Sequence, residues 1–387
     1  MYDVIVVGAG VEGLGTARYL AKSNANVLLF DQFTVPHSQG SSHGKSRGIR
    51  YTYSQPYYVE MMPEAFELWK ELEKECADQL YLKTGIVCLQ PYNMCKEVSD
   101  TLRSKKIPHQ FLSSSEIEQR FPGLKAEKLS AIFEEHGGIL KADNCISALL
   151  ESFKRFGGIF TQGKVLSIQS VNGDLVKVKT NNGVFFAKSV VLACGPWIND
   201  VLKPLGLQIP VMPTKAAIVY WKVKTQDVYS ASKFPVTSVT GSKHCFYSTP
   251  EMEYKDLVKV AYYGGIALTS PDDASKPLTP GQRAVEKEIM DNMKTFVSRH
   301  YPDLFPEPHS IVTCFFSMTP DEDFILDKHP KYSNIIIGAG FSGHGFKMAP
   351  VIGQILGDLA LKKKSKYSLE PFSLSRFPDF NLFESKL

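Results

Sequence analysis

The chain has 387 residues and a formal net charge of +4, with 43% hydrophobic and 22% charged residues. Its length exceeds a typical domain of roughly 100–200 residues, so we expect two domains. The composition is that of an ordinary globular protein. It lacks a basic stripe with interleaved aromatics and an apolar run of about 20 residues, which argues against nucleic-acid binding and against a membrane span.

The seven cysteines are irregularly spaced and form no CxxC pair, which favours a reducing intracellular compartment and predicts no metal site. The chain enters a strand-like run, "DVIVVG", almost at once, so we expect no signal or transit peptide. The lysines at 362–364 are typical of a solvated helix end. The last three residues, Ser385-Lys386-Leu387, match the peroxisomal address, so we expect import by the receptor that reads it.

The first 31 residues read as a βαβ unit. Residues 3–7 are a continuous apolar run, typical of a strand buried on both faces, and a second strand, "NVLLFD", ends at Asp31. Such a unit requires a parallel sheet with a right-handed crossover.

Gly8, Gly10 and Gly13 form GxGxxG between the first strand and the helix. The first glycine permits the tight turn, the second lets backbone approach a pyrophosphate, and the third lets helix and strand pack closely. Asp31, 18 residues past Gly13, is placed to accept hydrogen bonds from ribose hydroxyls. The alternative is a purely structural glycine turn. This context predicts a dinucleotide, without choosing between NAD and FAD.

The middle of the chain alternates between helix and strand patterns. We expect a helix over 57–77, a capping box at Ser113 and Glu116, and a helix in "ISALLESFKRFGG" closed by Gly157 and Gly158. Strands are expected over 163–171, 175–180 and 183–187, the last two joined through Asn182-Gly183. The buried run 189–195 is expected to return to the first sheet.

Residues 211–313 are rich in β-branched and aromatic side chains, interrupted by an amphipathic helix near 283–300 with Val285, Ile289, Met293 and Phe296 on one face. The run from Asn334 then predicts a strand, a glycine-rich turn and a long helix. The nucleotide domain is therefore predicted to be discontinuous. It would comprise 1–84, 142–210 and 315–387, with a second, substrate domain at 85–141 and 211–314.

Four later segments, in order, carry a more specific signal: "GSSHGKSRGIR" (40–50), "ACGPW" (193–197), "TPDEDFILDKHP" (319–330) and "GAGFSGHGFKMAP" (338–350). Together they resemble the monomeric sarcosine oxidase family, whose peroxisomal branch includes sarcosine and L-pipecolate oxidases. The resemblance implies an α/β fold, with a Rossmann-type FAD-binding domain and an α+β catalytic domain built on a mixed sheet. We also expect a monomer.

The resemblance further implies that FAD is attached covalently through Cys314. A thiolate is a side chain nucleophilic enough to attack the activated methyl of an oxidised flavin. Cysteine statistics alone favour a buried structural thiol at Cys314, and Cys194, at the end of an apolar strand, keeps that interpretation.

By the same resemblance, Arg50 and Lys347 bind the substrate carboxylate. Arginine offers a planar fork and lysine a point charge. The alternative for either cation is a solvated surface position. Both lie in glycine-rich segments rather than on a polar helix face.

Further site residues match family positions. His43 and Arg47 match family positions beside the flavin ring, where a cation would stabilise its reduced form. Lys259 matches the oxygen-activating lysine, although strand alternation alone would point it to solvent. Tyr247 matches a substrate-side tyrosine, or is core. The second glycine run, Gly338, Gly340 and Gly343, would let backbone approach the flavin, or is a helix-start turn.

The sequence departs from the family at three positions. Tyr263 stands where members often have a substrate-lining histidine, which leaves the substrate preference open. Gly48 replaces a branched residue, and Asp31 stands where glutamate is commoner.

The resulting hypothesis is an oxidase of small secondary amino acids that yields an imine and, from oxygen, hydrogen peroxide. The rivals are a dehydrogenase using another acceptor, a non-catalytic flavoprotein and an NAD-dependent reductase. Fold alone does not separate them.

Overall fold

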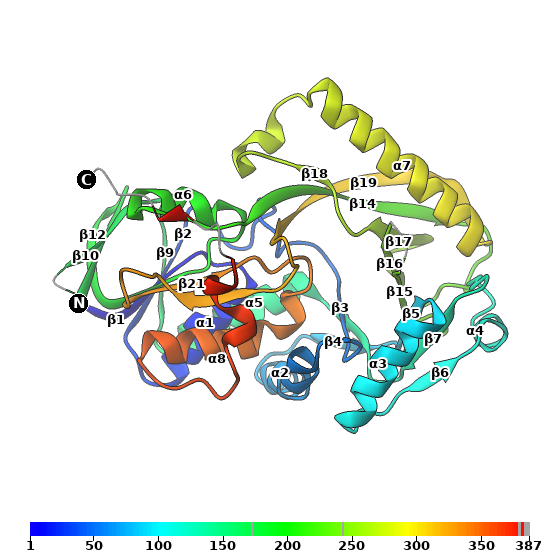
Figure 1. The fold of residues 1–387 in the computed structure, drawn as a ribbon, viewed down its shortest axis with the longest axis horizontal. Coiled ribbons are helices and arrows are strands. Elements are labelled where there is room, and N and C mark those ends of the chain that lie inside the picture. Colours follow the sequence, from blue (N-terminus) through cyan, green and yellow to red (C-terminus); the bar gives the residue numbers. More distant parts are fainter. Residues whose placement is uncertain (172, 242–243, 378–380, 383–387) are drawn as a thin grey trace.

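Two β-sheets organise the molecule, and the chain passes between them several times (Figure 1). A computed structural model describes residues 1–387 except 172, 242–243, 378–380 and 383–387. The closing tripeptide Ser385-Lys386-Leu387 therefore lies outside the described residues. The α/β class predicted from the sequence is confirmed.

The first sheet has a parallel centre. Its strands, in spatial order, are β10 (Val165–Val171), β11 (Leu175–Thr180), β12 (Gly183–Leu192), β1 (Tyr2–Val7), β2 (Val27–Asp31) and β9 (Ile159–Gln162), with β21 (Ile335–Ala339) against β12 and β20 (Ile325–Lys328) against β21. β12 and β2 flank β1 in parallel, which confirms the βαβ unit. Residues 4–7 of β1 are buried, as expected for a strand covered on both faces.

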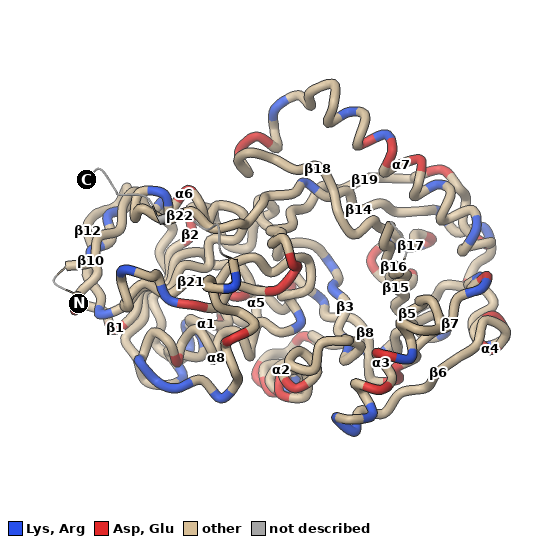
Figure 2. The backbone as a smooth tube through the Cα atoms, viewed as in Figure 1, with Lys and Arg blue, Asp and Glu red and all other residues tan. Residues whose placement is uncertain are grey.

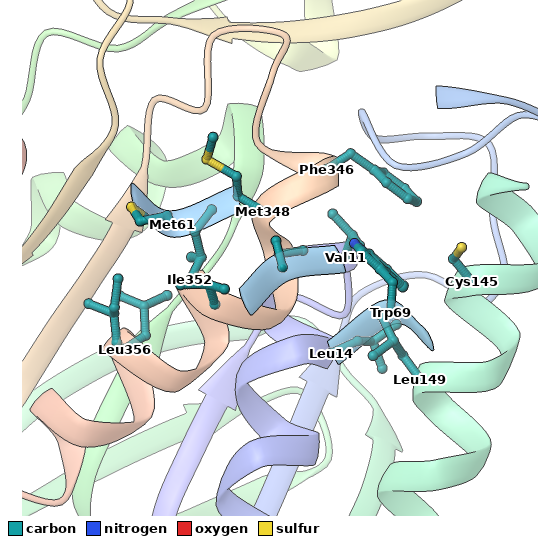
Figure 3. Packing of buried hydrophobic residues seen from close by; sticks show 14 of the residues in the cluster. Val11, Leu14, Met61, Trp69, Cys145, Leu149, Phe346, Met348, Ile352 and Leu356 are labelled. Atoms are coloured by element: carbon teal, nitrogen blue, oxygen red, sulfur yellow. The ribbon is translucent and has the colours of Figure 1, made fainter. Parts of the chain in front are cut away.

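Helices α1 (Val11–Lys22), α2 (Pro56–Lys74), α5 (Ala142–Arg155) and α8 (Ala349–Ala360) pack on one face of this sheet (Figure 1). α1 and α8 cross very closely, because a Cβ at Gly353 would lie 2.4 Å from the carbonyl carbon of Gly15. Figure 3 shows the apolar cluster under this crossing, which includes Val11, Leu14, Ile352 and Leu356. The crossing fixes the start of α1 relative to the start of α8.

The second sheet is mixed. Its strands, in spatial order, are β18 (Ile266–Ala267), β14 (Met212–Val223), β17 (Leu257–Tyr262), β16 (Phe246–Tyr254), β15 (Val236–Val239), β5 (Ile86–Gln90), β7 (Ser130–Glu134) and β6 (Gln110–Leu112), with β19 (Leu304–Met318) along β14. β15 pairs with β5 in parallel and the other pairs are antiparallel. Helices α3 (Tyr92–Ser104), α4 (Ser114–Arg120) and α7 (Pro280–His300) flank this sheet (Figure 1).

Smaller elements complete the fold. β3 (Arg47–Ile49), β8 (Gly138–Leu140) and β4 (Tyr81–Lys83) form a three-stranded sheet, and β13 (Leu207–Gln208) pairs with β22 (Asn381–Leu382). Short α6 (Ile198–Leu202) follows β12. β3 carries Arg47 and ends beside Arg50, so this small sheet positions the glycine- and serine-rich loop.

Several local predictions are confirmed. The capping box at Ser113 and Glu116 is present at the start of α4, and α5 ends before Gly157, which has φ +84°. The predicted helix over 57–77 is α2, and the segment after β21 turns through glycines into α8.

Three expectations need correction. The strands predicted at 183–187 and 189–195 are the single strand β12, whose first half pairs with β11 and whose second half pairs with β1 and β21. Its hairpin turns one residue earlier than predicted, since Thr180 pairs with Gly183 and leaves Asn181 and Asn182 in the loop. Val285 on α7 is 42% exposed, because only the C-terminal half of α7 packs on the sheet.

Charges of both signs are interspersed along the chain (Figure 2). Within the described residues no helix has the length and apolar character to cross a bilayer, and no group of His, Cys, Asp and Glu is arranged to hold a metal ion. Strands from 2–31, 159–192 and 325–339 build the first sheet, and strands from 86–134 and 212–318 build the second. The predicted domain boundaries themselves stay a prediction.

Candidate active site

A cavity of about 880 Å³ is lined by residues of both sheets. Its walls are the glycine-rich turn after β1, the loop over 40–50, strands β16, β17 and β19, and the segment over 341–347. Most of the predicted site residues line it, although they come from distant parts of the sequence. Its size lies in the range of a cofactor site.

The nucleotide end is made of backbone. Gly8 has φ +101°, and a Cβ there would lie 2.3 Å from the carbonyl oxygen of Ala193. A Cβ at Gly13 would lie 1.8 Å from the carbonyl oxygen of Gly8, so Gly13 serves helix–strand packing. Gly10, the N-cap of α1, has only the Ser42 hydroxyl near its missing Cβ, at 3.2 Å. This is the open approach to a helix N-terminus that a pyrophosphate needs.

Asp31 closes this end of the cavity at the C-terminus of β2. Its carboxylate accepts hydrogen bonds from the backbone N–H groups of Ala9 (2.7 Å) and Phe33 (2.8 Å), and His37 Nε2 lies 3.5 Å away. These bonds fix the carboxylate at the cavity wall, where its remaining lone pairs suit ribose hydroxyls.

Arg47 holds the loop before β3 around itself. Its guanidinium donates to the carbonyl oxygens of Ser41 (2.8 Å), His43 (2.6 Å) and Ser46 (2.8 Å). The same side chain lies 3.8 Å from the sulfur of Cys314, which is buried on β19. A fixed positive charge therefore lies beside the one thiol that the family resemblance singles out.

Several buried polar atoms on the cavity wall have no hydrogen-bond partner among the described residues. They are Ser41 Oγ, His43 Nε2, Thr249 Oγ1 and Ser317 Oγ. Buried polar groups in proteins are normally paired, so these atoms are ready for a ligand rich in hydrogen-bonding groups, such as FAD. Burial, reinforced by Arg47, lowers the pKa of His43 to about 4. His43 is therefore neutral near pH 7, and Arg47 supplies the positive charge expected of this pair.

Arg50 and Lys347 meet over one aromatic ring. The Arg50 guanidinium lies 4.3 Å and the Lys347 ammonium 5.8 Å from the centre of the Tyr53 ring. Lys347 donates to the carbonyl oxygen of His344 at 2.9 Å, and among the described residues no carboxylate pairs with either cation. Burial, then the charge of Arg50, lowers the pKa of Lys347 well below its ordinary value. A bound carboxylate would relieve this repulsion.

The hydrophobic core fixes Lys347 in place. The Trp69 indole N–H donates to the carbonyl oxygen of Lys347 at 2.9 Å, and the Trp69 ring stacks on Phe346 with centroids 5.9 Å apart (Figure 3). Met348, directly before α8, is fully buried in the same cluster. The lysine is thus presented from a rigid turn rather than from a mobile loop.

Lys259 is buried on β17. It is therefore not the solvent-exposed lysine that the alternating pattern of the strand alone would predict. Its ammonium pairs with Glu253 on β16 at 2.7 Å. Tyr247, on the same strand as Glu253, also lines the cavity, and burial raises the pKa of its hydroxyl.

Tyr263 is tied to the second glycine run. Its hydroxyl donates a short hydrogen bond to the carbonyl oxygen of Ser342 and lies 3.3 Å from a Glu322 carboxylate oxygen. A Cβ at Gly343 would lie 2.7 Å from the Tyr263 ring. Tyr263 is therefore a fixed wall of the cavity, with Phe316 beside it at 5.6 Å between ring centres.

Gly340 is placed differently from the prediction. Its φ is +64°, and a Cβ there would lie 2.3 Å from the Thr319 methyl carbon, while the residue itself does not line the cavity. The structural interpretation of this glycine, a turn before the helix, fits the geometry, whereas Gly343 does line the cavity. Gly338 packs against Leu356 of α8.

Sequence reasoning missed several wall residues, including Tyr53, His344, Glu12 and Glu253. Glu12 lies in the first turn of α1, and burial raises its pKa to about 7. A carboxyl group directly before the third glycine of GxGxxG was a visible signal. The sequence carried no such signal for Glu253, because its partner Lys259 is six residues away on the next strand.

Comparison with known proteins agrees with this geometry. Residues 3–359 match the family described as FAD dependent oxidoreductase. The chain is 41% identical to the peroxisomal sarcosine oxidase of Homo sapiens over 98% of this chain and 97% of that protein. It is 33% identical to the monomeric sarcosine oxidase of Arthrobacter sp. (strain TE1826), over 97% and 96%. Among solved structures, NikD, described as an unusual amino acid oxidase, superposes with a TM-score of 0.81 at 24% identity, covering 96% and 97%.

The last similarity shows a shared fold, and the first three show the family. The cavity agrees with it independently, through its backbone nucleotide end and its orphaned polar atoms. The chain belongs to the FAD-dependent oxidoreductases and, within them, to the monomeric sarcosine oxidase family.

Proposed function

We propose that this protein is an FAD-dependent oxidase of small secondary amino acids, such as sarcosine or L-pipecolate, producing an imine and hydrogen peroxide. One observation carries the substrate class. Arg50 and Lys347 both lie near the ring of Tyr53 at a cavity wall, and no described carboxylate forms an ion pair with either of them. The field of the buried Glu134 reaches Arg50, but no carboxylate contacts either cation among the described residues. Two neighbouring cations with no anion in contact form a site for an anionic group, and an amino acid supplies a carboxylate.

In this proposal the substrate carboxylate lies between the Arg50 fork and the Lys347 ammonium. Both cations lie within cation–π distance of the Tyr53 ring, and Tyr263 with Phe316 limits the space for the rest of the substrate. A confined site of this kind favours a small amine. The amine binds deprotonated, so the carbon–hydrogen bond beside it can be oxidised without a separate protein base.

FAD, when bound, takes two electrons and a proton from the amine and passes the electrons to oxygen. Gly8, Gly10 and Asp31 would hold its nucleotide part, and Arg47 would place a positive charge beside its ring. Lys259 would place a second positive charge, besides that of Arg47, where oxygen reacts. Water then hydrolyses the released imine.

We also propose that the flavin is attached to Cys314. The support is the buried position of this thiol on β19, 3.8 Å from the Arg47 guanidinium. A neighbouring cation stabilises the negative charge of an attacking sulfur.

The function is tested by mixing the purified yellow protein anaerobically with sarcosine, L-pipecolate and L-proline, then admitting oxygen. We expect at least one amine to bleach the flavin absorbance and oxygen to restore it with one peroxide per turnover. Bleaching without reoxidation by oxygen would support the dehydrogenase alternative. No bleaching by any secondary amino acid would support a non-catalytic flavoprotein.

Two further proposals concern the cell. The mammalian relatives are named peroxisomal, and this chain carries Ser385-Lys386-Leu387, so we propose a peroxisomal location, where peroxide is destroyed. Import would require the receptor for that tripeptide, and removing it should leave a fluorescently tagged protein in the cytosol. We also propose a monomer, in line with the names of the bacterial relatives.

A further inference from the structure

A closed polar network surrounds Lys259. Its ammonium lies 2.7 Å from Glu253 Oε1, and the two side chains are only 5% and 2% exposed. Glu253 is on β16 and Lys259 on β17, so neighbouring antiparallel strands carry the two charges. The electrostatic attraction within a pair this little exposed to water is far stronger than the attraction within a surface pair.

The remaining polar atoms of the pair are also satisfied. The Tyr220 hydroxyl, on β14, donates to Glu253 Oε2 at 2.6 Å. Ser46, in the loop before β3, accepts from Lys259 through its hydroxyl oxygen and donates the hydroxyl proton to Glu253. The network therefore links three strands of the second sheet to the loop that precedes β3 and Arg47. Lys259, Glu253, Tyr220 and Ser46 all line the cavity.

The pKa of Lys259 depends on its burial and on three neighbouring groups, Glu253, Arg47 and Cys314. Burial lowers the pKa of Lys259, Glu253 opposes this, and Arg47 lowers it further, with the thiol of Cys314 also nearby. Burial opposes ionisation of Glu253, but Lys259 together with the hydroxyl groups of Ser46 and Tyr220 more than offsets it, so the pKa of Glu253 lies below its ordinary value. Without Glu253, the buried ammonium of Lys259 would feel the positive charge of Arg47 with no carboxylate beside it, and lysine, unlike arginine, would lose its proton.

We propose that Glu253 is a positioning residue that keeps Lys259 protonated and fixed at the cavity wall, and so sets the upper pH limit of the reaction with oxygen. The proposal rests on the oxygen-facing role of Lys259 in the proposed function. The alternative is that Glu253 merely fastens the loop at Ser46 to the sheet. That structural role would change stability but not a pH profile.

The test uses E253Q, which keeps an oxygen acceptor for Tyr220 and Ser46 but removes the charge. The flavin-loaded protein is reduced with dithionite, so no amine is needed, and its reoxidation by oxygen is followed from pH 6 to 10. A lysine acts as a cation only below its pKa, so the reoxidation rate falls as pH rises through that pKa. In E253Q we expect the midpoint of this fall about one to three pH units lower than in the wild type.

A second readout is the flavin reduction potential as a function of pH, measured against redox dyes. Losing the negative charge of Glu253 should raise the potential of E253Q at low pH. The difference from the wild type should shrink as Lys259 loses its proton. A constant offset across the pH range, together with an unchanged midpoint of reoxidation, would overturn the proposal.

E251Q is the matched control. Glu251 lies on the same strand and bonds to the backbone N–H of Asp256 at 2.7 Å, so this variant removes the same charge without touching the network. We expect its pH midpoint to equal that of the wild type. If E253Q does not fold, E253D tests the same idea. This variant keeps the negative charge at a greater distance from Lys259, so the pH midpoint of reoxidation should shift in the same direction by a smaller amount. No shift of the midpoint in a folded E253D would then contradict the proposal. A wild type that no amine reduces would refute the proposed function and leave this test intact.

Discussion

The two ends of the cavity are built on different principles. At the nucleotide end the chain offers mainly backbone, with Gly8 and Gly10 at a turn and the start of α1, together with the carboxylate of Asp31, all within the first 31 residues. At the amino-acid end it offers charged side chains, among them Arg50, Lys259 and Lys347, which only the fold brings to one cavity. A backbone site can be encoded in one short segment, whereas a cluster of like charges needs a surrounding structure to hold it together.

Substitutions at the two ends of the cavity should therefore have different effects. Substitutions at the nucleotide end should disturb folding and cofactor retention, because the glycines serve packing as well as binding. Substitutions at the charged end should leave the fold intact and change chemistry, because removing one of several repelling cations relieves strain.

The sharpest test lies at the junction of the two ends, at Cys314. In Cys314→Ala we expect acid-precipitated protein to lose all its yellow colour, because the proposed sulfur link is gone while the nucleotide end still binds FAD reversibly. The measurement is flavin absorbance in the pellet and supernatant. Cys194→Ala is the matched control, because Cys194 is a half-buried thiol that also lines the cavity, and its pellet should stay yellow. Colour retained in the Cys314→Ala pellet would refute the link.

At the amino-acid end, Arg50→Met should lower kcat/KM for the best amine by about 30- to 5,000-fold. This range corresponds to roughly 2–5 kcal/mol for breaking a buried charge pair, at about 1.4 kcal/mol for each tenfold change. The measurement is anaerobic flavin reduction against amine concentration. Arg103→Met, which removes an exposed cation of α3, is the control and should behave as the wild type. If Arg50→Met were reduced by the amine as fast as the wild type, Arg50 would not bind the substrate carboxylate.

At the nucleotide end, Gly13→Ala and Gly10→Ala should separate folding from binding. The new methyl group in Gly13→Ala meets the carbonyl oxygen of Gly8 at 1.8 Å, and we expect overpacking to cost about 1–3 kcal/mol, seen as a lower melting temperature. Gly10→Ala meets only the Ser42 hydroxyl, at 3.2 Å, and should melt near the wild type but retain less FAD. Equal behaviour of the two variants would show that the glycines do not divide these roles.

The smallest effect is expected at Tyr263. Tyr263→Phe removes the hydrogen bond to Ser342, worth roughly 0.5–1.5 kcal/mol, and should loosen the turn that presents Lys347. We expect KM for the amine to rise by about two- to tenfold with little change in kcat, measured by peroxide release. Tyr262→Phe, the neighbouring position on β17, controls for the loss of a tyrosine hydroxyl. A changed substrate preference in place of a changed KM would assign Tyr263 a direct contact with the amine.

Much of the fold followed from local patterns. Apolar runs gave β1 and β21, GxGxxG gave the turn into α1, and the Ser113–Glu116 pair gave the cap of α4. Predictions were wrong where tertiary contacts override local pattern. β12 continues past the expected break because different partners take over its two halves. Val285 is exposed because the sheet covers only part of α7.

By itself the sequence determined the nucleotide end, because a tight turn, a helix N-terminus and a strand-end carboxylate follow from residue types at short spacing. Family resemblance, rather than spacing, pointed to Arg50, Lys259, Cys314 and Lys347. Only the tertiary structure decided that Lys259 is paired with Glu253, that His43 is neutral and that Gly340 lies away from the cavity. Those properties depend on burial and on charges brought close from distant segments, and neither quantity is encoded in a local pattern.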